Sequence, residues 1–196
     1  MTKRIPLEGA RVEVLSAVGR YGGFFEVVGV KKPGGGGCWC MSYRDSRLSS
    51  EERPLFMQAE CAQEPGPGVL AYVDGEPAGW CSVAPRSSYR RLMASRTIPF
   101  LDDRAAWSIV CFVVRPAHRG QGLMHVLLDG AVEHARTHGA ALVEGYPIDS
   151  DAPGRVDVIS GYVGTTDLFE RAGFARAAET TAHSGGRVRW IMRKEL

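Results

Sequence analysis

The sequence has few of the features that mark membrane-spanning, nucleic-acid-binding or secreted proteins. No apolar run among its 196 residues approaches the roughly 20 residues of a membrane span. Its net charge is only +2, from 24 basic and 22 acidic residues, so it lacks the large excess of positive charge that is typical of nucleic-acid-binding proteins. The first residues lack the apolar core of a signal peptide. We therefore expect a cytoplasmic protein with no nucleic-acid partner and no membrane partner.

Cysteine is scarce and irregularly placed, which argues against a fold built on disulfides. The five cysteines are an odd number, and most of them are expected to be small buried hydrophobic side chains. The one close pair, Cys38 and Cys40, would need two further ligands to hold a zinc ion. We therefore expect no metal.

Hydrophobic periodicity and turn signals divide the chain into strands and helices, with no linker or internal repeat. A capping box at Ser49 and Glu52 opens one helix, and Asp74-Gly75 predicts a hairpin turn. The expected helices end near residues 63, 138 and 172, and the expected strands are 11–15, 69–73, 77–84, 107–114, 140–145, 174–181 and 187–193. A chain of this length and pattern predicts a single domain, residues 1–196.

Three segments are expected to be loops. Residues 31–37 contain four consecutive glycines and predict a flexible loop. Residues 147–160 predict an irregular loop with several acidic residues, and residues 85–106 predict a long connection. Long loops in compact domains are often functional. The arginines of this connection are expected either to be solvated or to form a lid over an anionic group: Arg86, Arg90, Arg91, Arg96 and Arg104.

The most informative segment is VRPAHRGQGL at residues 114–123, which joins the buried strand 107–114 to an amphipathic helix. Backbone N–H groups at the start of a helix are free, and the helix dipole favours negative charge there. Gly120 and Gly122 let the backbone approach a phosphate closely. The turn is neither a Walker A sequence nor a dinucleotide fingerprint. It predicts a ligand that carries a pyrophosphate.

The pattern Val-x-Pro-x-x-Arg-Gly-x-Gly after a strand resembles motif A of the GNAT superfamily of acyl-CoA-dependent N-acetyltransferases. A second segment, LFERAGF at residues 168–174, looks like the helix that ends in a Gly-Phe pair in that family. Together the two motifs cover about residues 68–193. The resemblance implies the GNAT fold, of the mixed α+β class: a central, mostly antiparallel sheet with helices on both faces and one splayed pair of parallel strands. It also implies acetyl-CoA as the acyl donor.

In that fold the donor's thioester arm lies between the two splayed strands, here 107–114 and 140–145. The resemblance assigns the pantetheine arm to the main chain of Phe112, Val113 and Val114, with the thioester carbonyl polarised near Val113. It assigns the pyrophosphate to the turn residues Arg119, Gly120, Gln121, Gly122, Leu123 and Met124. Met124 departs from the family, which usually has Gly or Ala there, and it also belongs to the apolar face of the helix.

The resemblance leaves the catalytic groups open. Many relatives have a tyrosine as leaving-group acid where this chain has Phe169, and a phenyl ring cannot donate a proton. Tyr162 lies seven residues earlier, on the same face of the helix expected at 161–172. We expect Tyr162 to orient the donor or to donate the proton, or else to be a packing tyrosine. Glu144, at the end of the strand beside the splay, is the candidate base, or else a solvated strand end.

These features favour an N-acetyltransferase that acts on a small-molecule amine by direct transfer in a ternary complex. A small amine would favour a pocket with carboxylates such as Asp149, Asp151 and Asp157. The alternatives are an acetyltransferase of protein or peptide amines, and an acyl-CoA-binding sensor that no longer catalyses transfer. The resemblance also allows a homodimer.

Overall fold

The computed structural model describes residues 7–30, 37–154, 156–157 and 160–196, and it contains one seven-stranded mixed sheet. The strand order is β1-β2-β3-β4-β5-β7-β6, and only the β4–β5 pair is parallel. This confirms the mixed, mostly antiparallel fold expected from the sequence. The strands are β1 (Val12–Ser16), β2 (Gly68–Val73), β3 (Glu76–Pro85), β4 (Trp107–Val114), β5 (Leu142–Gly145), β6 (Ala175–Ser184) and β7 (Arg187–Glu195).

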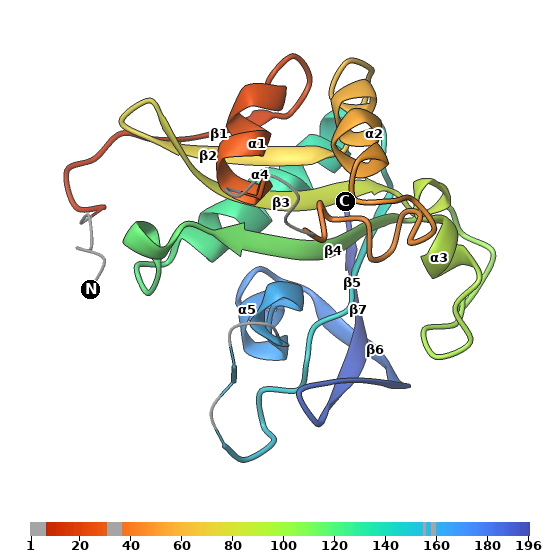
Figure 1. Ribbon diagram of the computed structural model, residues 1–196. Coiled ribbons are helices and arrows are strands. Elements are labelled where there is room, and N and C mark those ends of the chain that lie inside the picture. The colour runs from red at the N-terminus through yellow and green to blue at the C-terminus, as the bar shows by residue number, and fades with distance from the viewer. Residues whose placement is uncertain (1–6, 31–36, 155, 158–159) are drawn as a thin grey trace.

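Helices cover both faces of this sheet (Figure 1). On one face, α4 (Leu123–Thr137) buries Leu127, Leu128 and Ala131 against β1 to β4. On the other face, α1 (Tyr21–Val28) and α2 (Glu52–Glu60) pack around Trp80. The remaining helices are α3 (Arg90–Met93) and α5 (Thr166–Arg171). Within the described residues no helix is long and apolar enough to cross a membrane.

Local signals in the sequence account for several of these elements. Ser49 and Glu52 exchange the two hydrogen bonds of a capping box at the start of α2, at 2.8 and 3.3 Å. Asp74 and Gly75 both have positive φ, as a tight hairpin turn between β2 and β3 requires. Gly139, with φ of +78°, follows the end of α4 as expected of a C-terminal cap.

The predicted helix over residues 161–172 is wrong, because the segment is broken in the middle. A 3₁₀ turn, Ser160–Val163, ends at Gly164, whose φ is +80°. Thr165 then caps α5 by accepting a hydrogen bond from the backbone N–H of Leu168 at 3.3 Å. Tyr162 and Phe169 therefore do not share a helical face. The short helix α3 was not expected, and residues 31–36 of the predicted glycine loop lie outside the described residues.

Candidate active site

The two parallel strands pair over only three positions and then separate. Trp107, Ser108 and Ile109 of β4 pair with residues 143–145 of β5, where β5 ends, whereas β4 continues to Val114. A bulge at Val110 marks the point of separation, because Ser82 pairs with Cys111 and Val83 with Ile109. The second half of β4 thus has an edge without a strand beside it, as the resemblance implied.

Two residues of β4 direct their main-chain groups toward this open edge. The N–H of Arg115 donates to the carbonyl of Ala78 on β3 at 2.9 Å, and hydrogen-bonded positions alternate along an antiparallel pair. Val113 therefore faces β3, whereas Phe112 and Val114 face the open edge. The Val114 carbonyl accepts a hydrogen bond from Arg119 Nε at 2.9 Å on that side. The main chain of Val113 itself is thus turned away from the open edge, and the N–H expected near Val113 to polarise the thioester carbonyl stays a prediction.

The turn after β4 forms the wall of a cavity of about 440 Å³. Gly120 and Gly122 have φ of +73° and +82°, and α4 begins at Leu123 without a side-chain cap. The N–H groups of Leu123 and Met124, its first two residues, have no hydrogen-bond partner among the described residues. All the residues that the resemblance assigned to the acyl donor line this cavity, except Val113 and Gln121. Gln121 instead holds the turn in place, since its side chain donates to the Ala117 carbonyl at 3.3 Å within the turn and accepts from the N–H of Leu7 at 3.0 Å.

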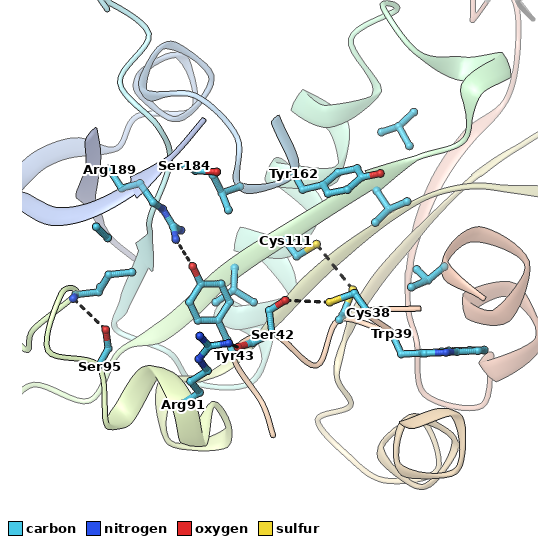
Figure 2. Close-up of a pocket in the computed structure, with 18 of the residues that line it drawn as sticks. Cys38, Trp39, Ser42, Tyr43, Arg91, Ser95, Cys111, Tyr162, Ser184 and Arg189 are labelled. Carbon is cyan, nitrogen blue, oxygen red and sulfur yellow. Dashed lines mark hydrogen bonds between the residues drawn. The ribbon is translucent and has the colours of Figure 1, made fainter. Parts of the chain in front are cut away.

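A larger cavity of about 1140 Å³ lies on the other side of β4. Its walls come from segment 38–43, from the connection after β3 and from the β6–β7 hairpin. The two cavities share three lining residues: Val114, Arg119 and Tyr162. In Figure 2 the Tyr162 side chain lies across the larger cavity from Tyr43 and Arg91. The predicted residue Tyr162 therefore stands where the two cavities meet.

Phe169, at the position where the resemblance implied a tyrosine, lies in the core. Its ring is fully buried and packs edge-on against Phe112 and Phe174, with ring centroids 6.1 and 5.0 Å apart. It lines neither cavity. Phe169 is a core residue, and the structure gives it no access to a reacting group.

Glu144 also lies away from both cavities, in a buried charge network. It is 1% exposed, and one oxygen accepts hydrogen bonds from Arg86 at 2.6 Å and from the Tyr146 hydroxyl at 2.8 Å. The other oxygen accepts from Arg193 Nε at 2.9 Å. Burial, and then the charge of Glu144, hold the pKa of Tyr146 well above its usual value. Neither predicted alternative, base or solvated strand end, matches this placement.

The acidic residues named as candidate acceptor ligands lie elsewhere. Asp149 and Asp151 form ion pairs with Arg176, at 3.8 and 2.8 Å, and neither lines the larger cavity. Asp157 lines the smaller cavity. The sequence did not indicate two charged residues that do line the larger one, Arg189 of β7 and Glu26. Their positions depend on contacts between distant segments, such as the hydrogen bond between Arg189 and the Tyr43 hydroxyl.

Two thiols meet at the wall of the larger cavity. The Sγ atoms of Cys40 and Cys111 lie 3.8 Å apart, and Cys40 Sγ accepts a hydrogen bond from Trp80 Nε1 at 3.0 Å. The hydrogen bond with Cys40, together with burial, raises the pKa of the Cys111 thiol well above its usual value. In the part of the chain that the structure describes, no group of three or more metal-ligating side chains is placed to hold a metal ion.

The comparisons with known proteins agree with this geometry. A family model described as Acetyltransferase (GNAT) family matches residues 38–147, more than half of the chain. The chain therefore belongs to the GNAT acetyltransferase family and is an acyltransferase. A search of curated proteins gives no match.

Solved structures share the fold at low sequence identity. The mosquito arylalkylamine N-acetyltransferase like 5b is 13% identical, with a TM-score of 0.58, over 95% of this chain and 100% of that one. Ribosomal-protein-alanine N-acetyltransferase from Brucella melitensis is 15% identical, with a TM-score of 0.54, over 95% and 99%. The protein yncA from Salmonella typhimurium, solved with its cofactor acetyl-CoA, is 16% identical, with a TM-score of 0.52, over 95% and 93%.

Proposed function

We propose that this protein transfers the acetyl group of acetyl-CoA to the amine of a small molecule, directly, in a ternary complex. The observation that carries the proposal is that Val114, Arg119 and Tyr162 line both cavities. The smaller cavity holds the donor, the larger cavity holds the acceptor, and the thioester lies where they meet. An amine in the larger cavity therefore reaches the acetyl group without a covalent intermediate on the protein.

The donor side fits a pyrophosphate and a pantetheine arm. The free N–H groups at the start of α4 and the charge of Arg119 bind the phosphates, because oriented N–H groups and a guanidinium both favour anionic oxygens. The open edge of β4 at Phe112 and Val114 offers main-chain groups to the amides of the arm. The N–H of Val114 faces the junction and polarises the thioester carbonyl.

On the acceptor side, the neutral amine nitrogen attacks the thioester carbonyl, Tyr162 donates a proton to the departing thiolate, and the proton that the nitrogen loses returns to Tyr162. The tyrosine hydroxyl is the one O–H group among the three shared lining residues. Glu144 holds the ends of β5 and β7 to the connection after β3 and takes no part in the chemistry.

Thermal unfolding with acetyl-CoA, followed by thiol release against a panel of amines, tests this function. We expect acetyl-CoA and CoA to raise the unfolding temperature, and an amine to release free thiol from acetyl-CoA. A temperature shift without thiol release from any amine would indicate the non-catalytic sensor. No shift with any CoA species would contradict the donor site itself. An acetyl adduct in the intact mass after incubation with acetyl-CoA alone would contradict direct transfer.

A further inference from the structure

The larger cavity carries an excess of positive charge at its wall. Its lining includes four arginines, Arg91, Arg115, Arg119 and Arg189, and one carboxylate, Glu26. Glu26 pairs with Arg115 at 3.7 Å. The residues outside the described ranges include no Asp or Glu, so none of them can add a carboxylate to this wall. A polycationic amine would meet like charge in this cavity.

Arg189 is the buried member of this group. It is 4% exposed, its Nε donates to the Tyr146 carbonyl at 2.7 Å, and its Nη1 donates to the Tyr43 hydroxyl. Among the described residues its Nη2 has no hydrogen-bond partner, and the two acceptors that its other nitrogens reach, a carbonyl and a hydroxyl, carry no charge. A buried charge is costly unless it is paired, so the site as it stands is incomplete without an anion.

Arg91 brings a second guanidinium to the same place. Its N–H donates to the Tyr43 carbonyl at 3.0 Å, and its Nη1 donates to the Ser42 carbonyl at 3.2 Å, which fixes α3 against the segment that carries Tyr43. Figure 2 shows Arg91, Tyr43 and Arg189 gathered at one part of the cavity, away from Tyr162. Two guanidinium groups with a phenol between them form a receptor for a carboxylate, which arginine binds through paired N–H donors.

We propose that the acceptor is an amine that also carries a carboxylate, such as an amino acid, and that Arg91 and Arg189, with Tyr43, bind this carboxylate. The amine then points toward the junction of the two cavities at Tyr162. The inference rests on the proposed function, because it names the acceptor class of the same site. It excludes polyamines and other acceptors without an anionic group.

The test uses sets of acceptors that differ only in the carboxylate. Each natural amino acid is compared with its primary amide and with its decarboxylated amine, in thiol-release assays of the full chain with acetyl-CoA. We expect at least one amino acid to be acetylated with a kcat/KM at least tenfold above its amide and its amine. O-phosphoethanolamine, an amine with a phosphate, shows whether carboxylate or any anionic oxygen group is required.

Variants of two neighbouring arginines give a matched control. Arg91→Gln removes the exposed guanidinium of the cavity, and Arg90→Gln removes its neighbour, which pairs with Asp45 and does not line the cavity. We expect Arg91→Gln to raise KM for the amino acid at least tenfold, with kcat and the KM for its amide little changed, and Arg90→Gln to change neither. Arg189→Lys is expected to act in the same direction as Arg91→Gln.

The outcomes separate this inference from the function on which it rests. If acetyl-CoA stabilises the protein but amides or polyamines are the preferred acceptors, or if no amino acid is acetylated, the carboxylate site is overturned and the donor site stands. Equal effects of Arg91→Gln and Arg90→Gln overturn it as well. If acetyl-CoA gives no stabilisation, the proposed function itself fails.

Discussion

The ring of Phe169 occupies the space that a side chain at Gly145 would need. A Cβ added at Gly145 would collide with the ring carbons of Phe169, so the last residue of β5 has no room for anything larger than glycine. This close approach sets α5 against the end of β5, where β4 and β5 separate. Phe169, where the resemblance implied a tyrosine, thus fills the space beside the splay.

Gly145→Ala should destabilise the fold by about 1–3 kcal/mol, because Phe169 is packed between two other rings and cannot move aside freely. Urea unfolding measures the change. Gly22→Ala is the matched control, since a Cβ at Gly22 in α1 meets nothing within 4 Å. Equal urea midpoints for Gly145→Ala and Gly22→Ala would contradict the tight packing of the Phe169 ring against Gly145.

Glu144→Gln should lower the free energy of unfolding by roughly 3 kcal/mol, because it leaves Arg86 and Arg193 without their shared carboxylate in a buried site. The folded fraction should retain the pH dependence of kcat/KM. Glu179→Gln, at an exposed position of β6, is the control for stability. If Glu144→Gln kept its stability and changed the pH dependence of kcat/KM, Glu144 would be the base after all.

Arg119→Gln should weaken CoA binding by roughly 10–100-fold, the loss expected for a charged hydrogen-bond donor facing a phosphate. Because this loss is electrostatic, it should shrink as salt is added. Titration calorimetry at two ionic strengths measures it. Arg136→Gln, on the far end of α4 where the guanidinium pairs with Glu133, should bind CoA like the unmodified protein. Unchanged CoA affinity in Arg119→Gln would show that the pyrophosphate does not bind at Arg119.

Tyr162→Phe should reduce kcat by about 100-fold, the usual lower contribution of a positioned proton donor, and leave the affinity for CoA unchanged. Single-turnover thiol release separates the chemical step from binding. Tyr21→Phe, a half-buried tyrosine of α1, is the control. Unchanged turnover in Tyr162→Phe would make Tyr162 a packing residue.

Acidification should destabilise the protein through His134. Burial, and then the charge of His138, lower the pKa of His134 from 6.5 to about 4. Between these values the unfolded chain binds the proton and the folded protein does not, so stability falls as the pH decreases from about 6.5 to about 4, by roughly 3 kcal/mol in total, and no further below. Urea unfolding at several pH values should show this slope. His134→Leu should flatten it, and an unaltered slope in that variant would assign it to other groups.

Much of the fold could be predicted from the sequence, because β4, the Gly120–Gly122 turn and α4 follow from local rules of burial, backbone freedom and helical spacing. The break at Gly164 was missed, although a glycine followed by a capping threonine is a signal for it. The register between β3 and β4 decides which edge of β4 the main-chain groups of Val113 face, and no local sequence pattern contains that register. The pairs Arg86–Glu144 and Tyr43–Arg189 join segments 58 and 146 residues apart, and their partners could not be chosen from the sequence.

The open edge of β4 has a consequence for how such a protein can evolve. A donor held by the main chain of Phe112 and Val114 and by helix N–H groups makes few demands on side chains, so substitutions there are tolerated while the backbone path is kept. This accords with structural neighbours that share the fold at 13% and 16% identity. If the larger cavity holds the acceptor, as proposed, selection for a new acceptor acts on its side chains, such as Arg91 and Arg189, which can change without rebuilding the turn after β4.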